Sequence, residues 1–207
     1  MLWVNLLIWA GGDVRSKGPR LYEDYTEDPE CYTTGLSEAC YSANIDLIKK
    51  LKLNPAQDDL SELLHSLAMG GKREALKYLL EMGAPPNNKP NGGSAALDTA
   101  LWRLDMARIF GNSIGGSRYG ASEALGCVAE LLAHGAIWAP DAYQINSLRK
   151  DLLAYDPGVT IDLLQLFRKH SSCPAMLIHK LIGTPKMKEH LKTQSWQLKR
   201  LGLTIGT

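Results

Sequence analysis

One short pattern occurs three times in this chain and constrains the fold more than any other feature. Residues 79–84, 131–136 and 7–13 each run from two apolar residues through two variable positions to glycine and a small residue. Recurrence of a local pattern is typical of a repeat array, in which one unit cannot bury its own apolar face and must stack on its neighbours. Repeat arrays are more often binding surfaces than catalysts, so the pattern favours a binding function.

The composition is that of a folded protein with nearly balanced charge. The chain has 207 residues, of which 45% are apolar and 22% are charged, and its net charge is +1. This length accommodates about five or six helical-pair repeats of roughly 33 residues each. A net charge this small gives no global field that attracts nucleic acid or an anionic membrane, so we expect neither as a partner. The charge is nevertheless segregated, because residues 23–30 are acidic and residues 180–200 are basic.

The cysteines and the first residues indicate a cellular compartment. The four cysteines are widely spaced, without the paired spacing of a zinc site or a disulfide scaffold, and this fits a reducing environment. Residues 1–10 are apolar, but they lack the basic start of a signal peptide and are shorter than a membrane span. We therefore expect a cytoplasmic protein without metal or cofactor, in which residues 1–10 form the second helix of a truncated first repeat.

The clearest repeat unit spans residues 62–84. Its first part, residues 64–71, predicts a short helix that ends at glycine. Its second part, residues 74–80, has apolar side chains on one face with a helical period and predicts a second helix. The same order of segments recurs upstream in residues 34–51 and downstream in residues 96–132.

These residues resemble the ankyrin repeat, a family of helix–turn–helix units. In the clearest unit, the consensus places of that family are held by Leu64, His65, Ala68, Gly71, Glu74, Leu79, Leu80, Gly83 and Ala84. The resemblance is good over residues 3–136 and weak beyond them. It implies an all-α solenoid of about five to six helical pairs with degenerate C-terminal units and short hairpin-like fingers, and a protein-binding role without catalysis.

The resemblance also predicts how the units divide one ankyrin-repeat domain over residues 1–207. The expected units are residues 1–34 (a truncated unit with a long acidic finger), 35–60, 61–93, 94–140 (with an insertion at 110–121), 141–173 and 174–207 (a capping unit). In the fifth of these units, His170, Ser171 and Ser172 replace the Gly-Ala finger of the family. The last unit is expected to turn its lysines outward and Leu177, Leu181, Met187 and Leu191 inward, because a cap meets water on one face.

No signature of catalysis stands out in the sequence. The glycine-rich residues 111–120 lack the lysine of a phosphate-binding loop and follow a helix, where that mechanism needs a preceding strand. The five histidines lie outside any signature with a nucleophile, and no zinc-protease or serine-hydrolase motif occurs. We expect no enzyme. Two alternatives stay open: a fragment of a larger ankyrin scaffold, or an enzyme or nucleotide-binding protein that uses residues 111–120.

Side chains typical of protein interfaces occupy one recurring position in the first helix of three successive units. Tyr41, Met69 and Trp102 hold this position, and we expect them to form a stripe on the concave face. The alternative is that they pack between neighbouring first helices. The other residues expected to contact a partner are Asp98, Arg103, Arg118, Tyr119 and Trp138.

A second candidate contact is the segment Arg20–Tyr32, which interleaves Tyr22, Tyr25 and Tyr32 with five carboxylates. Such a segment suits a basic protein partner, because carboxylates steer the encounter and aromatic rings bury contact area. The alternative is an exposed linker. The basic residues 180–200 are too sparse to predict nucleic-acid binding. The chain also resembles compact bacterial ankyrin proteins, some of which are immunity proteins that inhibit a toxin, and this role is a hypothesis from the resemblance.

Overall fold

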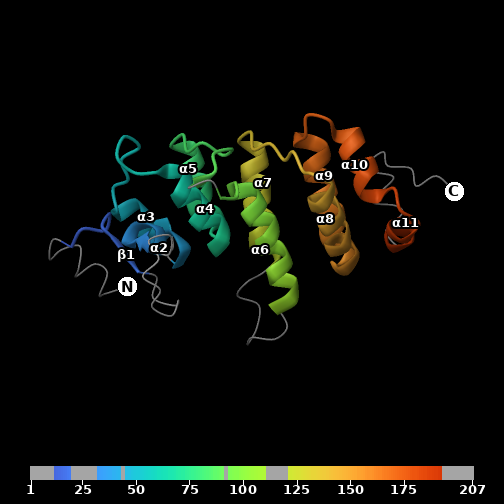
Figure 1. Ribbon diagram of the computed structural model, residues 1–207, viewed down its shortest axis with the longest axis horizontal. Helices are drawn as coiled ribbons and strands as arrows, with labels where there is room; N and C mark the ends of the chain where they lie inside the picture. The colour runs from blue at the N-terminus through green and yellow to red at the C-terminus, as the bar shows by residue number, and fades with distance from the viewer. Residues whose placement is uncertain (1–11, 20–31, 43–44, 91–92, 111–120, 193–207) are drawn as a thin grey trace.

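The fold is an elongated row of helices. The computed structural model describes residues 12–19, 32–42, 45–90, 93–110 and 121–192, and Figure 1 shows the helices following one another along the long axis. In these ranges the first six helices are α2 (Gly35–Ser42), α3 (Ile45–Lys50), α4 (Leu60–Gly70), α5 (Arg73–Glu81), α6 (Ala96–Phe110) and α7 (Ala121–Ala133). The remaining four are α8 (Ala142–Ala154), α9 (Pro157–His170), α10 (Pro174–Ile182) and α11 (Pro185–Lys192). The predicted all-α repeat solenoid is confirmed.

Helix α4 shows why these residues form helices with defined ends. At its start, the Asp59 carboxylate accepts hydrogen bonds from the backbone N–H groups of Ser61 (2.9 Å) and Glu62 (3.2 Å). At its end, Gly71 has a left-handed φ of 63°, which only glycine adopts without strain. Between the caps, the buried apolar side chains are Leu60, Leu63, Leu64, Leu67 and Ala68. The helix is therefore fixed by its caps and by one apolar face.

The repeated sequence pattern corresponds to one repeated helix ending. Gly83 after α5 and Gly135 after α7 have left-handed φ values of 93° and 87°. The next residue, Ala84 or Ala136, donates its backbone N–H to the carbonyl oxygen five residues earlier, at 3.0 and 2.9 Å. Both alanines are 3% exposed. The two second helices therefore end in the same way, as the sequence pattern predicts.

The first helices of successive units pack directly on one another. Helix α2 packs on α4 and α4 on α6, while α5 packs on α7 and α7 on α9. The approach of α2 to α4 is very close, because a Cβ atom on Gly70 would lie 2.2 Å from the Tyr41 carbonyl oxygen. Farther along the chain, the contacts between the third and fourth helical pairs are made mainly by α7 and α9.

The last helices cover the end of the core. Leu181, Met187 and Leu191 are fully buried and Leu177 is 7% exposed, whereas Lys180, Lys186 and Lys192 are exposed. The four predicted apolar residues therefore face inward and these three lysines face outward, whereas Lys188 is half-buried. No helix in the described part of the chain is long and apolar enough to cross a membrane.

An ion pair joins residues 12–19 to the helical array. The Arg15 guanidinium donates from Nε to Oδ1 of Asp58 (2.6 Å) and from the second terminal nitrogen to Oδ2 (3.0 Å), while the Asn54 backbone N–H donates to Oδ2 (2.7 Å). The Asp58 side chain is 1% exposed. The same segment leads into β1 (Lys17–Pro19), which pairs antiparallel with β2 (Tyr32–Thr34). Asp58 thus connects the strand pair to the helical array.

We expect Gly70→Ala to destabilise the fold by about 1–3 kcal/mol, because the added methyl group meets backbone that cannot move without separating α2 from α4. The matched control is Gly126→Ala in α7, where the methyl group meets only the Arg73 side chain, 2.5 Å from Cδ. That side chain can move, so the control should change stability by less than about 1 kcal/mol. Urea denaturation measures both variants, and equal stability would contradict the close approach of α2 and α4.

Hydrogen bonds from Arg15 hold the pKa of the Asp58 carboxyl below its ordinary value of 3.8. The ionised carboxylate therefore stabilises the fold above that value, and the contribution is lost as the pH falls through the lower pKa of the folded state. We expect Asp58→Asn to lower the free energy of unfolding at pH 7 by about 1–3 kcal/mol. The difference from the unmodified protein should shrink below pH 4. Urea denaturation across this pH range measures it, and a constant difference would contradict the role of the charge.

Candidate functional site

The predicted stripe lies at one register position of the three first helices α2, α4 and α6. In each helix a buried leucine is followed four residues later by a second buried residue, and the stripe residue comes next. The buried pairs are Leu36 and Cys40, Leu64 and Ala68, and Leu97 and Leu101. Tyr41 and Trp102 are 41% and 50% exposed, and Met69 is half-buried. We call these three residues the first-helix stripe.

Helix α6 has apolar side chains on two faces. One face is buried in the core and consists of Leu97, Ala100, Leu104 and Ala107. The other face carries Trp102, the half-buried Met106, and Ile109, which is 41% exposed. The spacing of these residues at i, i+4 and i+7 places them in one row. A helix with an apolar row outside its core contact offers that row to a partner.

The second apolar row exists because α6 is longer than its neighbour. Leu97 occupies the register position of Leu64, so the end of α4 at Gly70 falls level with Arg103. Residues 104–110 extend beyond that level by about 10 Å, at about 1.5 Å per residue. Figure 1 shows α6 projecting past α4 on one side of the row. The outward side of this projection, including Ile109, has no α4 residues beside it to cover it.

Two predicted charged residues flank Trp102. Asp98 lies one turn before it in α6 and is half-buried. Arg103 follows it and is also half-buried; its Nε lies 3.7 Å from the place that a Cβ on Gly71 would take. The structure thus brings Asp98, Trp102 and Arg103 together on α6, beside the end of α4.

The finger after α5 is tied to the finger after α7 by a single side chain. The Asn87 amide donates to the Gly135 carbonyl oxygen (3.0 Å) and accepts from the Ile137 backbone N–H (2.7 Å). The predicted residue Trp138 follows in the second finger, and its ring stacks on Phe167 of α9 with centroids 4.8 Å apart and an interplanar angle of 14°. Trp138 lies in the finger row and not beside the first-helix stripe.

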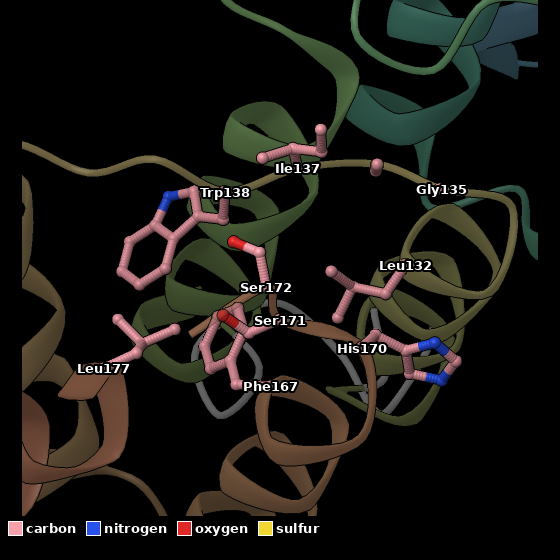
Figure 2. Close-up of a pocket in the computed structure, with 10 residues that line it drawn as sticks. Leu132, Gly135, Ile137, Trp138, Phe167, His170, Ser171, Ser172 and Leu177 are labelled. Atoms are coloured by element: carbon pink, nitrogen blue, oxygen red, sulfur yellow. The ribbon is translucent and has the colours of Figure 1, made fainter. Parts of the chain in front are cut away.

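A cavity of about 160 Å³ lies beside this stacked pair, between the finger and the end of α9. Figure 2 shows Trp138 and Leu177 on one side of the cavity and Leu132 and His170 on the other. Ser171 and Ser172 also line it. Burial and the nearby Lys169 charge lower the pKa of His170. The sequence interpretation included Trp138 but missed the cavity, whose Phe167 wall comes from a distant helix.

Several predicted residues fall outside the described part of the chain. These are Tyr22, Tyr25, Arg118 and Tyr119, together with the glycine-rich residues 111–120. The backbone of Tyr32 pairs with Pro19 in the strand pair that flanks residues 20–31. Contacts of these residues with a partner stay a prediction.

The described residues offer little catalytic chemistry. No group of three or more histidine, cysteine, aspartate or glutamate side chains among them is arranged to hold a metal ion. Burial raises the pKa of Cys40 and of Cys127 to about 12, so neither thiol is a nucleophile at neutral pH. Several large apolar and aromatic side chains are exposed, among them Trp102 and Ile137, and these suit binding.

We expect Asn87→Ala to destabilise the array by about 1–2 kcal/mol, because two hydrogen bonds between the fingers are lost. The neighbouring Asn88 is exposed, so Asn88→Ala is the matched control and should leave stability unchanged. Thermal denaturation of both variants measures the difference. Equal melting temperatures for Asn87→Ala and the unmodified protein would show that the link does not stabilise the array.

Comparison with known proteins supports the repeat architecture. Residues 64–110, which span most of α4, all of α5 and all of α6, match a family model described as ankyrin repeats (many copies). No curated protein and no solved structure matches the chain. Because this match and the shared helix endings after α5 and α7 agree, we conclude that the chain contains ankyrin repeats, with residues 64–110 matched to the family.

Proposed function

We propose that this chain binds a partner protein through the first-helix stripe and the adjoining apolar row of α6. Ankyrin repeats generally mediate protein–protein interaction. The observation that carries the proposal is the exposure of Trp102 and Tyr41, at 50% and 41%, at one register position of packed helices. Large aromatic side chains concentrate binding energy at interfaces, because they bury much area at little cost in conformational entropy.

The apolar row of α6 extends this surface. Met106 and Ile109 continue from Trp102 along the same side of the helix. A methionine adapts its shape to a partner, while the aliphatic and aromatic groups supply contact area. The partner surface that fits is therefore an apolar ridge, such as a helix or loop, that lies along α6 and reaches α2.

The charge of the first helices favours a basic partner. Helices α2, α4 and α6 carry the carboxylates of Glu38, Glu62, Asp98 and Asp105, against the cations Arg103 and Arg108. Residues 23–30 add further carboxylates on the chain segment between β1 and β2. Complementary charge speeds encounter with a partner and excludes proteins of the same sign.

The cysteines support a reducing compartment such as the cytoplasm. Cys40, Cys127 and Cys173 are free thiols, and the first two are buried. Free buried thiols are usual where glutathione keeps cysteine reduced. We therefore propose that the protein acts there as a binding module without catalytic chemistry of its own.

A finer form of the proposal is that the protein inhibits its partner, as an immunity protein inhibits a toxin. Its support is the resemblance to compact bacterial ankyrin proteins. The enzymatic activity of an identified partner, assayed with and without this chain, tests that form separately from binding.

The test of the binding proposal has two steps. The intact protein and the variant Tyr41→Ala/Met69→Ala/Trp102→Ala are used as affinity baits, and the captured proteins are identified by mass spectrometry. The purified partner is then titrated with Trp102→Ala by calorimetry. We expect a loss of affinity of about 30-fold or more, because a buried interface tryptophan contributes about 2 kcal/mol or more.

The matched control is Tyr143→Ala in α8. Tyr143 is 79% exposed but lies outside the stripe, so its removal should leave affinity unchanged. Circular dichroism of each variant checks that the fold is intact. A partner that binds the triple variant as tightly as the unmodified protein would refute the stripe as the binding surface.

A further inference from the structure

We propose that the cavity beside Trp138 and Phe167 is a second binding site, which takes one apolar side chain from an extended acidic segment of a partner protein. This inference rests on the protein-binding function proposed above and names the kind of segment that binds. It concerns the finger row and not the first-helix stripe.

The cavity lies where the row of fingers ends. Asn87, four residues after Gly83, links its finger to the next one. The corresponding position of the next finger, four residues after Gly135, is Ala139, which has no side-chain amide. That finger therefore lacks a side chain that could form the hydrogen bonds by which Asn87 links two fingers.

The following helical pair supplies no finger to cover this edge. Helix α9 ends at His170 and α10 begins at Pro174, so only Ser171, Ser172 and Cys173 connect them. As a result Ile137 is 66% exposed, and the cavity beside it stays open. An extended segment that lies along Ile137 and Trp138 would take the place of the missing finger.

The size and walls of the cavity select a single apolar side chain. Its volume of about 160 Å³ is well below the 300–1,000 Å³ of typical cofactor and small-molecule sites. Its apolar walls are Leu132, Trp138, Phe167 and Leu177. The stacking of Trp138 on Phe167 gives these walls a fixed shape before anything binds.

The basic end of α9, which carries the lining residue His170, favours an acidic segment. The last turn of α9 carries Arg168 and Lys169 directly before the lining residue His170. Among the described residues, neither Arg168 nor Lys169 forms an ion pair with a carboxylate. Carboxylates on the bound segment would therefore meet unneutralised cations.

Synthetic peptides test this site. The panel consists of acetylated peptides in which one apolar anchor residue (leucine, isoleucine, methionine or phenylalanine) is followed by a flank of three glutamates. In one kind of counterpart alanine replaces the anchor residue, and in the other kind three lysines replace the glutamates. Binding to the intact protein is followed by the indole N–H signal of Trp138 in two-dimensional NMR, which is assigned by its loss in Trp138→Phe. We expect at least one acidic peptide with an apolar anchor to shift this signal, and both kinds of counterpart to bind at least tenfold more weakly.

Two variants with a matched control locate the binding. Ser172 is exposed and lines the cavity, so Ser172→Leu should fill it and weaken the best peptide at least tenfold. Ser147→Leu makes the same exchange at an exposed position of α8 outside the cavity and should bind normally. The double variant Arg168→Glu/Lys169→Glu should also bind the best peptide more weakly, because its new carboxylates repel the glutamates of the peptide.

The outcomes separate this site from the first-helix stripe. Peptide binding that is unchanged in Trp102→Ala but lost in Ser172→Leu supports the cavity as a binding site. This holds even if the partner captured in the affinity experiment does not bind the first-helix stripe. If no acidic peptide shifts the Trp138 signal at millimolar concentration, the proposal is wrong. It is equally wrong if lysine-flanked peptides bind as tightly or if Ser172→Leu has no effect, and neither result bears on the stripe.

Discussion

The burial of each helical pair against the next is the interaction on which this structure depends. A single pair cannot enclose its own apolar side chains, so stability comes from the interfaces between successive units. At the interface of α2 and α4, Gly70 has no Cβ atom, and the Tyr41 carbonyl oxygen occupies the space that a methyl group would need. The same stacking fixes which side chains are left outside. Tyr41 and Trp102 each directly follow a buried core residue, and their side chains remain 41% and 50% exposed.

The repeat pattern becomes irregular at the third helical pair, α6 and α7. Both candidate binding surfaces include residues of this pair. Helix α6 is longer than α4, so Ile109 lies past the end of α4 and is 41% exposed. The finger after α7 has Ala139 in place of an asparagine, and the next pair has no finger to meet it. In a repeat array, a surface that one unit would normally bury in the next is exposed wherever the next unit departs from the pattern. These departures therefore provide apolar surface without weakening the units that follow the pattern.

The sequence predicts local features well and distant contacts poorly. The glycine endings at Gly83 and Gly135, the second helix of the clearest unit and the inward residues of the cap follow from patterns within a few residues, and the structure confirms them. The stacking of Trp138 on Phe167 joins residues on different units, so no local pattern indicates it. The ion pair of Arg15 with Asp58 is of the same kind. The two apolar faces of α6 were present in the sequence, but their spacing shows two rows only when the helix is known to continue to Phe110.

The two proposed sites lie in different parts of the array: the first-helix stripe on α2, α4 and α6, and the cavity between α7, α9 and α10. A partner that lies along α6 and extends a segment to the finger row would contact both, and the second contact would then be intramolecular. Such linkage raises affinity without any single strong contact, provided that the spacing of the partner's two elements matches the spacing of the sites. The spacing is set by α7, which packs on α6 and also carries Leu132 of the cavity wall. The packing of α6 on α7 would therefore select partners by the spacing of their two elements, while Trp102 and the cavity each select by side-chain chemistry.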